Sequence, residues 1–241
     1  MYIRIASNDF FAVSKDVVSR MIAGQLTAGQ AYQAFNAQLL AEDAPADDET
    51  VLTSGKGYSN VFHANGGTAA FSVMANTLRG VYGTDVLLAT ANSFTGSVLQ
   101  ADYNQKMAAS MIMPNGLMSR QCTMTGAELK ETVRAFVEGC EGGFVPFNRG
   151  SLPVVSGIAV EVKEANGSYT LAGITRNGQP LGDNDTVTVT CLATEKQLGT
   201  LLAGNSGTSA CEDAWVKDTW CDYVSGGGAA LAEPENYMTL R

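Results

Sequence analysis

The segment MIMPNGLMSRQCTMTGAELKETV, residues 111–133, decides the fold. It begins with a Pro-Asn-Gly turn at 114–116, because these three residue types favour the backbone angles of tight turns. Residues 117–124 then alternate loosely, which predicts a β-strand. Thr125 with Glu128 three residues later forms a capping-box pattern, which predicts the start of a helix. The segment therefore predicts a turn, a strand and a helix that follow one another directly.

Two helices and a buried strand are expected around this segment. The helix that starts at Thr125 is predicted to run to Gly139, because glycine commonly ends a helix. Another helix is expected to begin at Thr68, which acts as an N-cap after a glycine pair, and to end at Gly80. The short apolar segment 84–91 predicts a strand that is buried on both faces.

The second half of the chain carries strand patterns. Residues 154–181 alternate at period two, and Asn-Gly turn signals stand at 166–167 and 177–178. Such a pattern predicts antiparallel hairpins. Residues 185–193 predict a further strand, and 236–241 predict a final edge strand.

The fold class follows from the order of these elements. Capping-box patterns at Thr194 and Ser209 predict two more helices after the hairpins, followed by a glycine break at 226–228. Helices and strands are thus interleaved, while the hairpins must be antiparallel. We therefore predict an α/β or α+β domain with a mixed sheet flanked by helices.

The first fifty residues are set apart from this domain. Two helices are expected within 1–40, the second with Thr27 as its N-cap. Residues 41–50 are acidic, contain a proline and lack an apolar period, so they predict a linker. We expect a short helical segment and linker over 1–50 and the main domain over 51–241.

Composition limits the classes of function. The hydrophobic content of 45% and the charged content of 16% are those of a globular protein. The formal net charge of −9 disfavours binding to nucleic acid or to an anionic membrane. No apolar run reaches the length of a membrane-spanning helix, and the start lacks the pattern of a signal peptide. A cytoplasmic protein and a fragment of a longer exported chain both fit this start, and we favour the fragment.

The sequence contains no self-contained catalytic motif. His63 is the single histidine, which disfavours a two-metal hydrolytic centre and leaves no partner set for a Ser-His-Asp triad. The five cysteines are odd in number and form no C-x-x-C pair, so we interpret them as small buried residues. A bridge between Cys211 and Cys221 is the alternative if the chain is exported. We expect no metal site and no cofactor in this chain.

From about Gly66 to the end, the order of segments resembles the C-terminal domain of the 5′-nucleotidase and UDP-sugar hydrolase family. The phrase Thr-Gly-Ala-Glu-Leu-Lys-Glu at 125–131 is similar to the start of a helix in that family. The resemblance implies a substrate-binding domain, because in that family a separate N-terminal domain carries two divalent metal ions and cleaves the phosphoester. The matching segments are TDVLLATA (84–91), MPNGLMSRQCTMTGAELKETV (113–133), SLPVVSGIAVEV (151–162), ITRNGQPLGDNDTVTVTC (174–191) and WVKDTWCDYVSGGGAALAEPENYMTLR (215–241).

The resemblance also implies where a substrate would bind. The family has Asn-Gly-Gly-Gly-Ile-Arg after the first strand, a Pro-Phe-x-Asn segment before the next strand, and a second aromatic residue near Thr194. Here the arginine position holds Thr95 and the first aromatic position holds Asn115, while Phe94 and Tyr103 are the aromatic residues nearby that are able to substitute. The candidate substrate-binding residues are Asn92, Thr95, Asn115, Leu117 and Thr194.

These departures leave two hypotheses for function. One is the substrate-binding domain of a 5′-nucleotidase-like hydrolase, whose partners are a nucleoside or nucleotide and the N-terminal catalytic domain of its parent chain. The other is a degenerate, non-catalytic module that binds a small ligand or a protein within a larger extracellular protein. Loss of stacking rings disfavours nucleobase binding, since each ring contributes on the order of 1–3 kcal/mol in other systems. The resemblance implies an extracellular or cell-envelope location.

Overall fold

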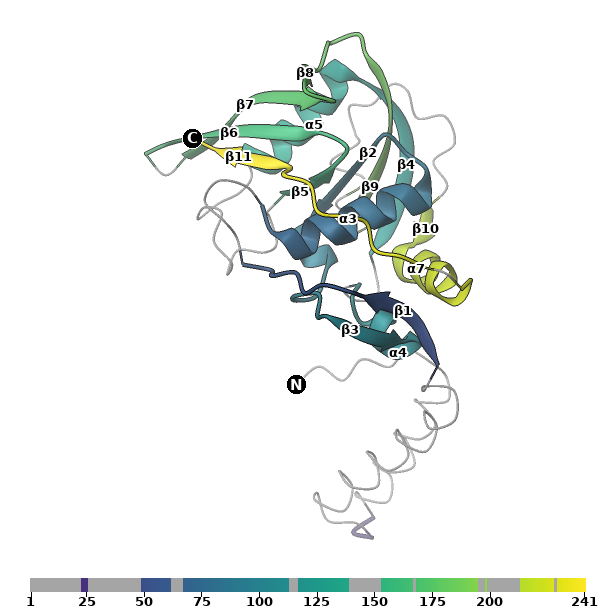
Figure 1. The fold of residues 1–241 in the computed structure, drawn as a ribbon. Helices are drawn as coiled ribbons and strands as arrows, with labels where there is room; N and C mark the ends of the chain where they lie inside the picture. The colour runs from purple at the N-terminus through teal and green to yellow at the C-terminus, as the bar shows by residue number, and fades with distance from the viewer. Residues whose placement is uncertain are drawn as a thin grey trace. The chain divides into compact units, whose positions relative to one another are not determined.

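The computed structural model describes residues 23–25, 49–61, 67–112, 117–138, 153–166, 168–194, 198, 213–227 and 229–241. The chain divides into two compact units, Met1–Glu49 and Thr50–Arg241. The two helices expected within 1–40 lie outside the described residues except for a turn at 23–25. The second unit has mixed sheets flanked by helices, so the predicted fold class is confirmed (Figure 1).

A five-stranded mixed sheet forms the centre of the second unit. Strand β2 runs parallel to β9, while β4, β5 and β10 are antiparallel to their neighbours. All five residues of β2 are buried, as expected for a strand covered on both faces. In the order across the sheet, the strands are β10 (Asp213–Trp215), β4 (Met118–Thr125), β9 (Thr186–Ala193), β2 (Val86–Thr90) and β5 (Pro153–Ser156).

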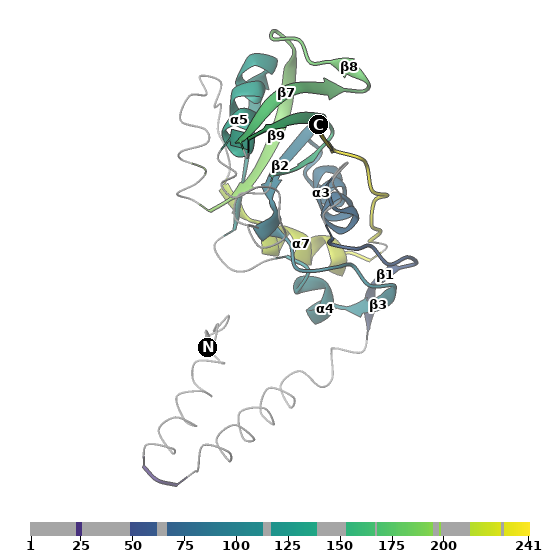
Figure 2. The same cartoon turned by 90° about the vertical axis from the view of Figure 1, so that its left-hand side faces the viewer.

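Helix α3 (Ala69–Tyr82) lies on one side of this sheet and α5 (Gly126–Glu138) on the other (Figure 2). The Thr68 side chain accepts a hydrogen bond from the Phe71 N–H at 3.1 Å, so the predicted N-cap is confirmed. The predicted end at Gly80 is wrong. The helix continues to Tyr82 and ends at Gly83, whose φ of 65° is the left-handed conformation that glycine adopts without strain.

Helix α5 begins with the predicted capping box. The Glu128 N–H donates to Thr125 Oγ1 at 3.2 Å, and the Thr125 N–H donates to Glu128 Oε2 at 2.8 Å. The N–H groups of Gly126 and Ala127 donate to backbone carbonyl oxygens in the turn before β9, at 2.7 and 3.0 Å. All of these donors are therefore satisfied, and the helix start is fixed to the turn at 182–185.

A second, four-stranded sheet contains the predicted hairpins. Asn166, Asn177 and Gly178 have φ of 55°, 52° and 75°, which confirms left-handed turn residues at both Asn-Gly positions. The predicted final strand is confirmed as an edge strand, parallel to β6. In order, the strands are β11 (Met238–Leu240), β6 (Ala159–Ala165), β7 (Ser168–Arg176) and β8 (Gln179–Pro180).

The extended segment before β11 is fastened along α3. Ser72 Oγ donates to the Glu235 carbonyl oxygen and accepts from the Glu235 N–H, both at 2.8 Å. Asn76 Nδ2 donates to the Glu233 carbonyl oxygen at 2.9 Å. Tyr237 covers Gly67 so closely that a Cβ there would lie 1.9 Å from the ring. Ser72 and Asn76 are one helical turn apart, so one face of α3 holds this segment.

Short elements complete the second unit. Strands β1 (Thr50–Ser54) and β3 (Ala101–Asn104) pair with each other, and α4 (Gln105–Ala109) follows β3. Helix α7 spans Val216–Ser225. The prediction of a helix from Ser209 is wrong for the described residues of that segment. Asp213–Trp215 forms strand β10, which pairs with the edge of β4. Pairing with an open strand edge has overridden the local helix signal.

Two of the cysteines pack in the core as predicted. Cys122 on β4 and Cys191 on β9 are buried, and a hydrogen bond from the Cys191 side chain lowers the pKa of the Cys122 thiol. Cys221 on α7 is half-buried, and burial raises the pKa of its thiol. No disulfide joins these three cysteines. Cys140, Cys211 and His63 lie outside the described residues.

Replacing Asp85 with asparagine is expected to destabilise the protein at neutral pH and much less in acid. Hydrogen bonds from Thr188 and the nearby Arg176 guanidinium hold the pKa of the Asp85 carboxyl below its ordinary value of 3.8. The carboxylate therefore stabilises the fold fully above about pH 4, and this stabilisation disappears as the pH falls through the lowered pKa. Solvent weakens the ion pair, since the Asp85 side chain is 36% exposed.

Urea unfolding of the Asp85→Asn variant and the unchanged protein between neutral pH and acid measures this difference. The gap in the free energy of unfolding should narrow as the solution becomes more acidic. An equal gap at every pH would show that the Asp85 carboxylate has no special ionic role.

Candidate functional site

Three strand ends meet at one edge of the five-stranded sheet. Strands β2 and β9 run in parallel, with Leu88 beside Cys191, so their carboxyl ends share this edge. Strand β4 runs in the opposite direction and begins here, with Met118 opposite Ala193. Ligands commonly bind beyond the carboxyl ends of such strands.

The structure brings four of the five predicted site residues to this edge. Asn92 and Thr95 follow β2, Leu117 directly precedes β4, and Thr194 directly follows β9. Leu117 and Thr194 are the chain neighbours of Met118 and Ala193, the last residues paired between β4 and β9 at this edge. Asn115 lies outside the described residues. The placement of these residues is consistent with one site, and ligand binding by them stays a prediction.

The two positions after β2 differ in what they offer a ligand. Asn92 is exposed in a short 3-10 helix, η1 (Ala91–Ser93), so its amide can both donate and accept hydrogen bonds. Thr95 Oγ1 donates to the Ser110 carbonyl oxygen at 2.5 Å. The Thr95 hydroxyl therefore keeps only its acceptor capacity for a ligand. It supplies no positive charge, unlike the arginine that the resemblance implies at this position.

The two positions on β4 and β9 are also neutral. Leu117 is half-buried against the core, and its carbonyl oxygen accepts from the Val216 N–H at 3.2 Å. This contact connects the start of β4 to α7. Thr194 is exposed, and its carbonyl oxygen accepts from the Leu198 N–H at 2.9 Å. Its side chain adds a second hydroxyl to this edge of the sheet.

Neither aromatic residue proposed as a substitute presents its ring to solvent. Phe94 is 1% exposed and packs on Phe71 with ring centroids 6.0 Å apart. Tyr103 is 5% exposed, and its hydroxyl bonds with the N–H and the carbonyl oxygen of Leu99. Both rings belong to the core, so the expectation that they replace a stacking aromatic does not hold in this conformation.

Trp215 is the feature that the sequence reasoning missed. It is 50% exposed and pairs in register with Met118, the residue after Leu117. An exposed indole offers a flat apolar face for stacking. The capping-box pattern at Ser209 placed this residue in a helix, and only the pairing of β10 with β4 shows its position beside the candidate site.

A buried hydroxyl lies in the same loop. Ser93 is fully buried, and its Oγ has no hydrogen-bond partner among the described residues. Burying a hydroxyl without a partner costs about 1–3 kcal/mol. The fold therefore carries a polar atom beside Asn92 whose presence core packing does not explain.

Two negative findings apply to the part of the chain that the structure describes. It contains no group of three or more histidine, cysteine or acidic side chains placed to hold a metal ion. It also contains no helix that is long and apolar enough to span a membrane.

Comparisons with solved structures identify the fold. The 5′-nucleotidase precursor of Thermus thermophilus matches with a TM-score of 0.62 and 13% identity over 88% of this chain. The sulfate thiohydrolase SoxB of the same organism matches with a TM-score of 0.64 and 14% identity over 90% of this chain. The Haemophilus influenzae NAD nucleotidase matches with a TM-score of 0.59 and 16% identity over 87% of this chain. This is the fold of the C-terminal part of 5′-nucleotidases.

The likeness is one of fold rather than of sequence. No protein-family model and no curated protein matches the sequence. The chain spans less than half the length of each of these proteins: 43% of the 5′-nucleotidase precursor, 40% of SoxB and 41% of the NAD nucleotidase. The 5′-nucleotidase fold is therefore present, while the activity of the longer proteins is not carried over by the comparison.

Proposed function

We propose that this chain is the substrate-binding domain of a 5′-nucleotidase-like hydrolase whose metal-binding catalytic domain lies outside this chain. The convergence of β2, β4 and β9 at one edge carries the proposal, because Asn92, Leu117 and Thr194 directly follow or precede these three strand ends. The 5′-nucleotidase fold supports it. Its partners would be a nucleoside or nucleotide and the catalytic domain of the parent chain, in an extracellular or cell-envelope setting.

The chemistry of the site favours a neutral ligand group over a phosphate. Asn92 and Thr194 supply an amide and a hydroxyl, and Trp215 supplies an exposed ring nearby. Amides and hydroxyls bind the edges of bases and sugars, while stacking on an aromatic ring contributes on the order of 1–3 kcal/mol per base. Threonine at position 95 offers no charge-assisted donor to an anion. We therefore expect adenosine to bind at least as well as AMP.

A second candidate function is a degenerate binding module without a nucleotide ligand. Thr95 in the place of the expected arginine and the burial of Phe94 favour it. In this case the fold serves as a scaffold for another small ligand or for a protein within a larger extracellular chain.

Calorimetric titration with adenosine, AMP and UDP-glucose separates the two functions. A substrate-binding domain is expected to bind adenosine, and Trp215→Ala should weaken that binding about tenfold because the stacking ring is lost. Thr95→Arg should strengthen AMP binding, while Thr123→Arg, at an exposed position further along β4, should leave it unchanged. Absence of heat with all three ligands at millimolar concentration would reject the first function. We also expect this chain alone to have no hydrolytic activity, and phosphate release from AMP with added Mn²⁺ or Zn²⁺ would contradict that expectation.

A further inference from the structure

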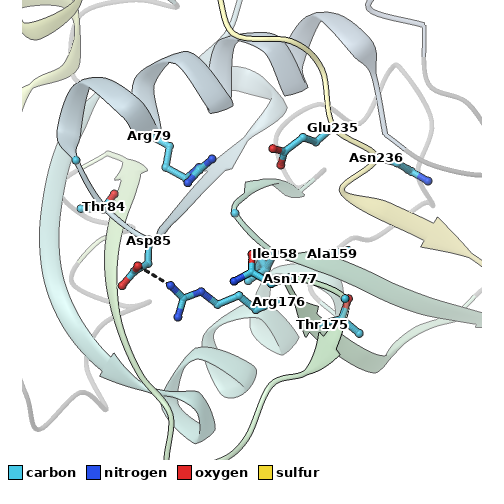
Figure 3. A pocket seen from close by; sticks show the side chains of 13 residues that line it. Arg79, Thr84, Asp85, Ile158, Ala159, Thr175, Arg176, Asn177, Glu235 and Asn236 are labelled. Atoms are coloured by element: carbon cyan, nitrogen blue, oxygen red, sulfur yellow. Dashed lines mark hydrogen bonds and ion pairs between the residues drawn. The ribbon is translucent and has the colours of Figure 1, made fainter.

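A polar pocket of about 420 Å³ lies at the opposite end of β2 from the candidate site. Asp85, which lines it, comes directly before β2, whereas Asn92 and Thr95 come after that strand. The end of α3, the turn between β5 and β6, and the turn between β7 and β8 form its walls (Figure 3). A pocket of this size fits a small molecule.

Arg79 is held in place by a chain of hydrogen bonds. Its Nε donates to Ser156 Oγ at 2.8 Å, and Ser156 Oγ donates in turn to Asn76 Oδ1. Ser156 and Asn76 are both buried. No carboxylate among the described residues lies within ion-pair distance of the Arg79 guanidinium, which extends into the pocket in Figure 3. Arg79 is thus a positioned cation whose Nη groups face the pocket.

The other charged pair in the pocket is already neutralised. Arg176 Nη2 lies 2.5 Å from Asp85 Oδ1. Asp85 Oδ2 accepts from the N–H and Oγ1 of Thr188 at 2.9 and 3.0 Å. Because both carboxylate oxygens have partners, Asp85 stabilises the pocket wall and leaves little capacity for a ligand.

Glu235 supplies the remaining charge. Its backbone is fixed on α3 by Ser72, while its exposed side chain lines the pocket and forms no ion pair within the described part of the chain. Figure 3 shows the Arg79 guanidinium on α3 and the Glu235 carboxylate on the segment before β11 facing one another across a gap, with no ion pair between them. The pocket therefore presents one positive and one negative side chain, neither of which forms an ion pair within the described residues, although the charge of Arg79 also contributes to the lowered pKa of Asp85.

We propose that this pocket binds a small zwitterion of the amino-acid type, with its carboxylate on Arg79 and its ammonium group on Glu235. A guanidinium binds a carboxylate through two parallel N–H donors, which matches the open Nη groups of Arg79. A phosphate dianion fits less well, because Glu235 repels it and Arg176 is already paired with Asp85. A Cβ on Gly157 would lie 2.0 Å from the Asp85 carbonyl oxygen, so this wall requires glycine.

Titration of the ¹⁵N-labelled full chain with L-alanine, followed by amide NMR shifts, tests the proposal. Saturable shifts are expected at Gly157, Asn177 and Gly178, which line the pocket. Acetate and ethylammonium each carry only one of the two charges, so each should bind at least about threefold more weakly. Glu235→Gln should weaken L-alanine binding by about three- to tenfold, and Arg79→Gln should abolish it.

Control substitutions and the position of the NMR shifts separate L-alanine binding in this pocket from loss of folding and from binding at the candidate site near Asn92. Glu164→Gln and Arg241→Gln change surface residues that do not line the pocket and should leave binding unchanged. Glu235→Gln removes no hydrogen bond that holds the fold, so it remains informative if Arg79→Gln fails to fold. Tight binding of inorganic phosphate without L-alanine binding, shifts confined to the Asn92 edge, or no shift at millimolar L-alanine would each overturn the proposal.

Discussion

Replacing Gly126 with alanine is expected to lower the free energy of unfolding by about 3 kcal/mol, the upper end of the usual cost of overpacking, because a clash with backbone atoms cannot be relieved by a rotamer change. A Cβ at this position would lie 1.9 Å from the Gly182 carbonyl oxygen. The start of α5 would have to move away from the turn at 182–185. That movement would also lengthen the hydrogen bonds from the Gly126 N–H to the Asp185 carbonyl oxygen and from the Ala127 N–H to the Asp183 carbonyl oxygen, now 2.7 and 3.0 Å.

Gly80→Ala is the matched control for this substitution. Gly80 lies in the last turns of α3, and a Cβ there would meet no atom within 4 Å. Because alanine has a higher helix propensity than glycine, this change should raise the free energy of unfolding by up to about 1 kcal/mol. Urea unfolding followed by circular dichroism measures both variants. Equal effects of the two substitutions would contradict the close approach at Gly126.

The start of α5 could be predicted because its signals are local. The capping box uses two residues three positions apart, and the structure forms both of its hydrogen bonds. The Asn-Gly turns were equally predictable, since their left-handed φ values are a property of those residue types. Contacts such as that of Gly126 with Gly182 required the fold, because the two positions are far apart in the sequence.

The sequence-based predictions were wrong where contacts between distant segments decide whether a residue lies in a helix or a strand. Gly80 and Gly83 are both able to end a helix, and α3 passes the first because the backbone takes a left-handed turn only at Gly83. The helix pattern at Ser209 gave way where Asp213–Trp215 pairs with the open edge of β4. Strand propensity depends on available partners rather than on the local sequence.

The candidate site after β2 and the pocket at the opposite end of β2 also differ in how far the sequence predicts them. Asn92, Thr95, Leu117 and Thr194 were predicted together because a family resemblance aligns loops that follow or precede strands, and parallel strands bring such loops to one edge. The pocket at the other end combines Arg79, Asp85, Arg176 and Glu235, which have no common spacing. Sequence patterns alone do not connect these residues, so the pocket could be found only in the folded chain.

Trp220→Ala is expected to lower the free energy of unfolding by about 3–5 kcal/mol. Trp220 is fully buried on α7, between Val216 and Val224 one turn away on either side, and its Nε1–H donates to the Ala108 carbonyl oxygen at 2.7 Å. The alanine variant would leave a cavity between α7 and α4. It would also remove one of the hydrogen bonds that the Ala108 carbonyl oxygen accepts, while the Met111 N–H still donates to that oxygen at 3.1 Å. Trp220→Phe should cost less, because it keeps most of the packing and loses chiefly the hydrogen bond.

The sequence contains two tryptophans, and the second supplies the control. Trp215 is half exposed, so Trp215→Ala should change the free energy of unfolding by no more than about 0.5 kcal/mol. Fluorescence of a Trp215→Phe variant then reports on Trp220 alone and should show the short-wavelength emission of a buried indole until urea unfolds the protein. If Trp215→Ala were the more destabilising of the two alanine variants, the helix α7 interface would not be the anchor that its burial indicates. A stable Trp215→Ala variant also separates the two roles of tryptophan here, since any loss of adenosine binding in it would then reflect the lost ring rather than an unfolded domain.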